Sequence, residues 1–338
     1  MGKKKTSQSR RNFDWESYLV QKKKKQWLSF AILVVCLPVI LAGFYGLLQG
    51  RHYLMVSLLI LVLVLICFLL TFERRKPRAR EIVLLSSMTA FCVVTNEICA
   101  HTIPLHAGTT MVVISGIALG PEAGFLVGAL GRLLCNFFDG QGPWTPWQMA
   151  AWGILGFLAG LVFNKAEPRG RFDGQETKTL AQKLSLEKSN SFRLVAGPLI
   201  CIIVAWLVAY LWYLMGGHTA GESFWGWRLY AFGGAGLLAG CLFQRKKLPA
   251  DAITTTVFTF VFVFLLYGGI MNFAAMLLSH GADSDSNEIT IETLKLLYLT
   301  GAPYDAAHAG TAALCMFLFG DSMLQKLQRI QIKFGMTF

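Results

Sequence analysis

The stretch Gly124–Gly160, GFLVGALGRLLCNFFDGQGPWTPWQMAAWGILGFLAG, contains two apolar runs joined by a short polar and aromatic island, DGQGPWTPW. Each apolar run has the length and composition of a helix buried in protein or lipid. The island places two tryptophans and two prolines at the ends of these helices. Aromatic rings and hydrogen-bonding groups on a proline-stiffened loop are typical of a small-molecule site. An interfacial aromatic belt would explain the tryptophans but not the rest of the loop.

Apolar runs recur along the chain and predict an all-α polytopic membrane protein. The 338 residues are 54% hydrophobic and 15% charged, and the charges lie in short clusters between the runs. Soluble domains contain about 25% charged residues, whereas a bilayer requires about 20 apolar residues per spanning helix. The net charge of +12 resides in these clusters and not on one basic domain, so it does not indicate nucleic-acid binding. The ten apolar runs cover residues 27–48, 53–72, 82–103, 109–119, 123–138, 147–163, 194–215, 229–243, 252–278 and 303–324.

Lysine and arginine clusters predict the orientation and the division of the chain. Residues 1–26 form a basic head that we expect in the cytoplasm, followed by a two-helix extension at 27–75. The membrane core is expected at 80–335, with a cytoplasmic linker inserted at about 166–192. The run 109–119 is short for a span, and the LGPEAG that follows it reads as a turn. Ten spans would place both termini on the cytoplasmic side of the plasma membrane.

The motifs of several protein classes are missing from the sequence. No P-loop, H-E-x-x-H or G-x-S-x-G pattern occurs, so ATP hydrolysis, zinc proteolysis and serine hydrolysis are not indicated. All eight cysteines lie inside apolar runs and read as small buried hydrophobic residues. We therefore expect no resident cofactor and no metal site.

Polar residues at helix ends on one side of the membrane are the candidate binding residues. Ionisable groups within apolar runs mark functional sites by default. Glu97 and His101 are four residues apart and share a helix face. Arg132 is expected either to face an interface at a helix end or to make an internal ion pair. Asp305 and His308, three residues apart, are expected to pair with each other. The candidate substrate-binding residues are Glu97, His101, His106, Asn136, Asp139, Gln141, Trp144, Trp147 and Asn272.

Three segments of the sequence resemble one family. The central block is GIALGPEAGFLVGALGRLLCNFFDGQGPWTPWQMAAWGILGFLAG at 116–160, and the others are YGGIMNFAA at 267–275 and GAPYDAAHAGTAALCMFLFGDSMLQKLQRIQIKFG at 301–335. They resemble the substrate-binding S components of energy-coupling factor (ECF) transporters. The resemblance covers about 80–335 and implies a bundle of about six core helices, to which this chain adds N-terminal and inserted helices.

The resemblance also implies a function and partners. An S component binds a vitamin or other micronutrient and works with a transmembrane T component and two ABC-type ATPases. The central block is most similar to members assigned to cobalamin-type substrates, so cobalamin is the expected ligand. S components contact the T component through small residues on the first core helix, where this chain has Ser86 and Ala90 at the matching spacing.

Two other readings of the same residues remain open at this point. An intramembrane enzyme could use Glu97, His101 and Asp139 as acid and base, although no nucleophile or metal set is recognisable. An autonomous secondary transporter would need charges near the bilayer midplane for ion coupling, whereas the charges here gather at helix ends.

Overall fold

A computed structural model describes residues 62, 79–102, 105–163, 180–218, 222–243, 247–282 and 291–334. All of them belong to the compact unit Leu61–Phe338. The expected basic head at 1–26 lies outside the described residues, and so does the two-helix extension at 27–75 apart from Val62.

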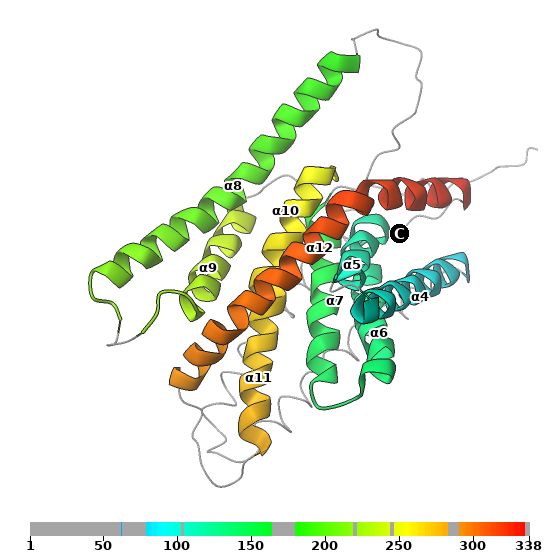
Figure 1. The fold of residues 1–338 in the computed structure, drawn as a ribbon. Helices are drawn as coiled ribbons and strands as arrows, with labels where there is room; N and C mark the ends of the chain where they lie inside the picture. The colour runs from blue at the N-terminus through cyan, green and yellow to red at the C-terminus, as the bar shows by residue number, and fades with distance from the viewer. Residues whose placement is uncertain are drawn as a thin grey trace, which may run out of the picture. The chain divides into compact units, whose positions relative to one another are not determined.

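The described residues form helices that follow the apolar runs of the sequence (Figure 1). The only β-pairing among them is an isolated bridge between Phe163 and Leu248. The elements are α4 (Ala79–Thr102), α5 (Ala107–Leu119), α6 (Pro121–Asp139), α7 (Thr145–Val162), α8 (Leu180–Leu214), α9 (Trp227–Phe243), α10 (Ala252–Phe262), the π-helix η2 (Val263–Tyr267), α11 (Gly268–Ala282) and α12 (Ile291–Phe334).

Three of these helices are long and apolar enough to cross a membrane by themselves. The first is α4, Ala79–Thr102, and the second is the part Ala196–Leu214 of α8. The third, Ala252–Leu278, runs through α10 and η2 into α11. Each coincides with an apolar run of the sequence. A bilayer needs about 20 apolar residues for a spanning helix. The prediction of an all-α membrane protein is therefore confirmed for the described part of the chain.

Helix α5 is short and lies inside the bundle. Every residue from Gly108 to Leu119 is buried, and the helix packs against α4, α6, α7 and α12. A helix that is apolar on all sides requires this position, because no face of it suits water. Gly120 then separates α5 from α6 with a φ of 96°, which favours glycine, and Pro121 opens α6. The turn predicted after the short run is thus confirmed.

Helices α6 and α7 form an antiparallel pair that is held close by glycines. A Cβ built on Gly124 would lie 2.4 Å from the carbonyl oxygen of Gly156, and one on Gly128 would lie 2.4 Å from that of Trp152. Backbones this close exclude any larger residue at these positions. Continuing the register by one more turn brings Arg132 opposite Gln148, at the loop end of the pair.

Helix α12 is longer than the sequence predicts. The apolar run suggested a helix from 303 to 324, but α12 extends from Ile291 to Phe334 and contains Pro303. Proline removes one backbone hydrogen bond inside a helix and is tolerated best in the first turn. The sequence therefore predicted that the helix begins at Pro303. Near the other end, the Gln331 amide donates to the carbonyl oxygen of Ala118 at 2.8 Å, so α12 also caps α5.

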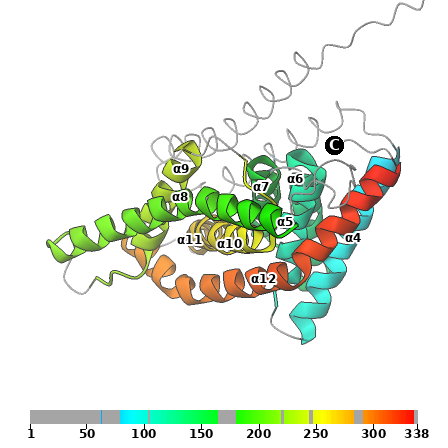
Figure 2. The ribbon, with the colours of Figure 1, turned by 90° about the horizontal axis from the view of Figure 1, so that it is seen from above.

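The pair α8 and α9 packs beside the other helices. Figure 2 shows α10 and α11 between α8 and α12. Helix α8 begins at Leu180, within the stretch 166–192 that was expected to be a cytoplasmic linker. Between the two helices, Arg228 is 1% exposed and its guanidinium bonds to Glu222 at 2.9 Å and to the carbonyl oxygen of Gly217 at 2.8 Å. This buried arginine holds the α8–α9 connection against α9.

Replacing Gly156 by alanine should destabilise the protein. The added Cβ would lie 2.3 Å from the carbonyl oxygen of Gly124, so the α6–α7 pair must separate. Overpacking of this kind costs about 1–3 kcal/mol. The apparent melting temperature of the purified protein in mild detergent measures the effect.

Gly310→Ala is the matched control. Gly310 also lies within a helix, but no atom lies within 4 Å of a Cβ built there. Alanine should be neutral or stabilising by up to about 1 kcal/mol at this position. Equal melting temperatures for the two variants would show that the close approach of α6 and α7 is not a determinant of stability.

Candidate functional site

The loop between α6 and α7 is held by its own polar side chains. The Thr145 hydroxyl accepts the Gly142 N–H at 3.2 Å and donates to the Gln141 Oε1 at 2.9 Å. The Gln141 amide donates in turn to the carbonyl oxygen of Leu133 at 3.1 Å. Gln141, predicted to bind substrate, therefore stabilises the loop in this structure. Trp144 is 42% exposed, which leaves its ring available for stacking.

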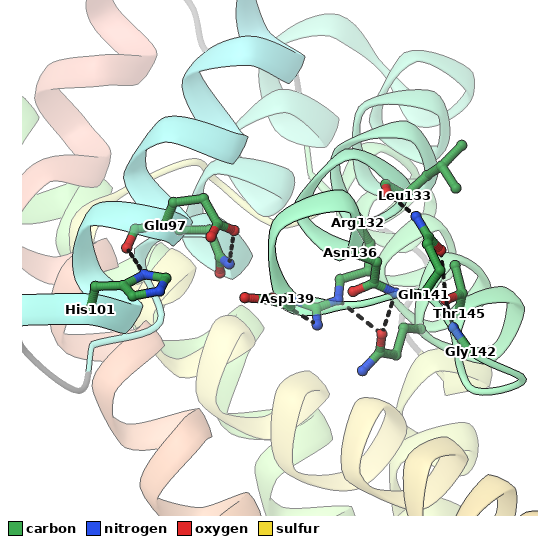
Figure 3. A network of polar contacts seen from close by, with 11 residues as sticks. Glu97, His101, Arg132, Leu133, Asn136, Asp139, Gln141, Gly142 and Thr145 are labelled. Carbon is green, nitrogen blue, oxygen red and sulfur yellow. Dashed lines mark hydrogen bonds and ion pairs between the residues drawn. The ribbon is translucent and has the colours of Figure 1, made fainter.

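Arg132 organises the polar residues behind this loop (Figure 3). Its guanidinium forms an ion pair with Asp139 at 3.3 Å, and its Nε donates to the Gln148 Oε1 at 3.1 Å. It also lies 5.5 Å from the centre of the Trp152 ring, within the range of a cation–π interaction. Of the two roles expected for Arg132, the structure shows the ion pair. We call Arg132, Asn136, Asp139, Gln148 and Trp152 the α6–α7 polar cluster.

The donors of the cluster determine how its amides are oriented. Arginine only donates hydrogen bonds, so the Gln148 oxygen must face Arg132. The Asn136 amide nitrogen then donates to the same oxygen at 2.8 Å and to the Thr145 hydroxyl at 3.0 Å. The Asn136 Oδ1 consequently points away and has no hydrogen-bond partner, although Asn136 is fully buried. An unpartnered buried oxygen is unfavourable by about 1–3 kcal/mol unless a ligand or water pairs with it.

Glu97 approaches the cluster from α4. Figure 3 shows its side chain pointing toward α6, where Arg132 and Asp139 project. The Glu97 Oε1 accepts a hydrogen bond from the Asn96 amide at 3.2 Å, while Oε2 is buried and has no hydrogen-bond partner by geometry. The Cys135 thiol, a weak donor, is its neighbour on α6. Glu97 is therefore a second buried acceptor beside Asn136.

His101 does not pair with the Glu97 carboxylate. The i, i+4 spacing predicted a shared face, but the His101 Nδ1 bonds to the backbone carbonyl oxygen of Glu97 at 2.8 Å. The shared helix face thus brings the His101 ring to the backbone of Glu97 near the end of α4.

Trp147 lies inside the protein and not at its surface. It is 2% exposed, and its ring packs edge-on against Phe273 of α11 at 6.1 Å. The indole N–H groups of Trp147 and Trp152 are both buried without a partner. Buried indoles normally find an acceptor. The role of Trp147 in stacking on a ligand remains a prediction.

His106 belongs to a separate cluster on α5 and α12. Its ring stacks on His308 at a centroid distance of 3.9 Å, and its Nδ1 lies 2.8 Å from the Thr311 hydroxyl. The His308 Nε2 lies 2.9 Å from the hydroxyl of Thr109. The structure thus joins His106 to α12, while its role in substrate binding remains a prediction.

Asn272 also lies in a cluster of its own, around the buried side chain of Asp305. The Asp305 Oδ2 accepts hydrogen bonds from the Asn272 amide at 2.7 Å and from the Tyr230 hydroxyl. The predicted pairing of Asp305 with His308 is wrong, because each has its own partners. Helix periodicity allowed the pairing, but the neighbouring helices supply better donors and acceptors. The Tyr230 hydrogen bond attaches α9 to α12.

Sequence reasoning missed Gln148, Trp152 and Tyr230. Gln148 is a polar residue near the start of an apolar helix, and it lies four residues before Trp152, so the two share a face. That spacing was the available signal for both. Tyr230 carried no signal, because only the packing of α9 against α12 brings it to Asp305.

The comparisons with known proteins relate part of the chain to a family of transport proteins. Residues 76–210 match the family model described as the S component of an ECF-type riboflavin transporter. Residues 76–210 belong to the S-component family of ECF transporters. S components are substrate-binding transport proteins and not enzymes, so the reading of Glu97, His101 and Asp139 as acid and base is set aside. The family model names riboflavin, and nothing in the match singles out cobalamin.

Shorter stretches resemble several curated proteins. A UPF0397 protein of Aliivibrio fischeri is 35% identical over 65 residues, which is 18% of this chain and 35% of that protein. A UPF0397 protein of Streptococcus gordonii is 29% identical over 91 residues, which is 27% of this chain and 44% of that protein. The chain thus spans less than half the length of these relatives. No solved structure matches it significantly.

Replacing Gln148 by leucine should destabilise the protein. Leucine keeps the volume but removes the oxygen that accepts from both Arg132 and Asn136. Two buried donors would lose a partner, at about 1–3 kcal/mol each. Gln328→Leu on α12, outside the cluster, is the control and should melt within about 1 °C of the parent. A Gln148→Leu protein as stable as this control would contradict the network.

Stability should fall in mild acid through His106. Burial, with a smaller contribution from the Arg132 charge, lowers the pKa of His106 below its usual range. The unfolded chain, with a histidine pKa of about 6.5, then takes up a proton that the folded protein does not. The melting temperature should therefore be constant above about pH 6.5 and fall as the pH drops below it.

A His106→Gln variant should show a shallower decline in acid. His218→Gln, on the α8–α9 connection, is the control and should keep the parent slope. A parent-like slope in His106→Gln would show that His106 does not cause the acid sensitivity.

Proposed function

We propose that this chain is the membrane substrate-binding subunit of an ECF-type importer for a vitamin or similar micronutrient. The proposal is supported by the S-component family of residues 76–210 and by the apolar helices of the described region. The observation that most directly supports the proposed function is the α6–α7 polar cluster beside Glu97. Two buried acceptor oxygens lack partners there, on Glu97 and on Asn136, next to an exposed tryptophan on a glycine- and proline-containing loop.

The proposed substrate-binding residues divide by their surroundings. Glu97, Asn136 and Asp139 offer oxygens, and Trp144 offers an exposed ring. Trp147, which is buried, would contact the ligand from the interior of the protein. Gln141, His101, His106 and Asn272 would act indirectly, since each is engaged in hydrogen bonds to the loop, to α4 or to α12.

The proposed partners are a T component and two ABC-type ATPases, since the sequence contains no P-loop of its own. The coupling residues would be Ser86 and Ala90 on α4. Both are exposed, and they lie on the same helix face as the exposed Ile82, Val83 and Val94. Small side chains between large apolar ones allow a second helix to approach closely. Both termini would lie in the cytoplasm of the cell that carries the protein in its plasma membrane.

Mass spectrometry of small molecules retained through purification in mild detergent tests this function. A stoichiometric, chemically intact vitamin is the expected result. Cobalamin was the expectation from the sequence, and riboflavin is the name of the matching family model, so both belong in a ligand panel if the protein is empty. A panel without any effect on the melting temperature, or a chemically altered product, would contradict the proposal.

Trp144→Ala should weaken binding of the identified ligand. If the exposed ring stacks on the ligand, its loss costs about 1–3 kcal/mol, which corresponds to a five- to 150-fold increase in Kd. Trp225→Ala is the matched control, because Trp225 is 65% exposed on the α8–α9 connection. Unchanged affinity in Trp144→Ala would assign this tryptophan to the interfacial aromatic belt.

A further inference from the structure

We infer that the α6–α7 polar cluster and Glu97 select a ligand that carries a positively charged nitrogen group with at least two N–H donors, such as an amidinium. The inference rests on the proposed function, because it names the chemistry of the ligand bound at that site. It follows from three observations: the charge of the site, the unpartnered atoms within it, and its access to the surface.

The first observation is an excess of negative charge. Glu97 and Asp139 supply two carboxyl groups, and Arg132 supplies one guanidinium, which pairs with Asp139 at 3.3 Å. Among the ion pairs of the described residues, none involves Glu97. A carboxylate removed from water needs a compensating charge and hydrogen-bond donors. A cationic ligand would supply both.

The second observation is that two side-chain oxygens of the site lack hydrogen-bond partners, beside one unpartnered donor, the indole N–H of Trp152. The Glu97 Oε2 and the Asn136 Oδ1 are buried without hydrogen-bond partners. The other oxygen of Glu97, Oε1, accepts a hydrogen bond from the Asn96 amide at 3.2 Å. Asn136 is oriented by Arg132 through Gln148, so its oxygen cannot be exchanged for the amide nitrogen without losing two hydrogen bonds. Hydrogen-bond donors on the ligand would therefore satisfy these two oxygens.

The third observation is that the site reaches the surface. The side chain of Asp139 is 31% exposed and that of Arg132 is 14% exposed, whereas Asn136 is fully buried. The polar groups thus extend from the surface to the interior. An anionic ligand group would meet the carboxyl groups of Glu97 and Asp139 and the amide oxygen of Asn136 there, so the same arrangement disfavours carboxylates and phosphates.

Three probes of one shape and different charge test the inference. Benzamidine is a cation with several N–H donors, benzamide is its neutral counterpart and benzoate is an anion. Binding to the full chain in mild detergent is measured by isothermal titration and by the shift in melting temperature. Benzamidine should bind about tenfold more tightly than benzamide or more, because hydrogen bonds between charged groups are the stronger ones. Benzoate should bind most weakly.

Glu97→Gln should abolish the preference for benzamidine over benzamide. Glu292→Gln, on the first turn of α12, removes the same charge elsewhere and should retain it. The comparison of probes on the parent protein stands by itself if Glu97→Gln does not fold. Equal binding of the three probes, no binding of any of them, or a preference that persists in Glu97→Gln would overturn the inference.

A parallel titration with riboflavin, which is neutral, separates this inference from the proposed function. If riboflavin binds with a loss of affinity in Trp144→Ala while the three probes show no charge preference, the substrate-binding function stands and the inference is wrong. If neither riboflavin nor any probe binds and no vitamin is retained through purification, the proposed function itself fails.

Discussion

The close approach of α6 and α7 is the constraint on which the rest of the site depends. The two helices run antiparallel, and glycines allow their backbones to meet at Gly124 with Gly156 and at Gly128 with Trp152. Each step of four residues along α6 is matched by four residues backward along α7. The same register, one turn further, brings Arg132 to Gln148. The polar cluster is therefore located where the row of glycines ends and the loop begins.

This register gives the polar residues a single consistent hydrogen-bonding pattern. Arg132 can only donate, so it orients Gln148, and Gln148 in turn orients Asn136. The consequence is an amide oxygen that faces away from its own network without a partner. A buried polar network whose hydrogen bonds are largely satisfied is rigid, so the unpartnered Asn136 oxygen has a defined direction. Such an atom suits recognition of a ligand better than it suits the stability of the fold.

The helices α8 and α9 are connected to the rest of the bundle by polar contacts as well as by apolar packing. Tyr230 on α9 donates to Asp305 on α12, and Lys295 on α12 lies 3.4 Å from Glu222 in the α8–α9 connection. Asn272 on α11 completes the surroundings of Asp305. Buried polar pairs of this kind favour one arrangement of the helices over others, because any shift would leave a carboxylate unpaired. The pair α8 and α9 therefore has a defined position against α12.

The sequence alone determined the helical class, the positions of most helices and the importance of the stretch 124–160. Apolar runs and turn residues are local signals, and a bilayer or a dry core permits few other structures for them. The ends of α12 and the start of α8 were misplaced, since proline and charged residues resemble helix boundaries even when tertiary packing continues the helix. Which polar residues meet was decided only by the tertiary structure. His101 and Glu97 had the right spacing but bond through the backbone, and Asp305 found Tyr230 and Asn272 in place of His308. Periodicity shows which residues share a helix face, but partners on other helices depend on the register and packing of those helices.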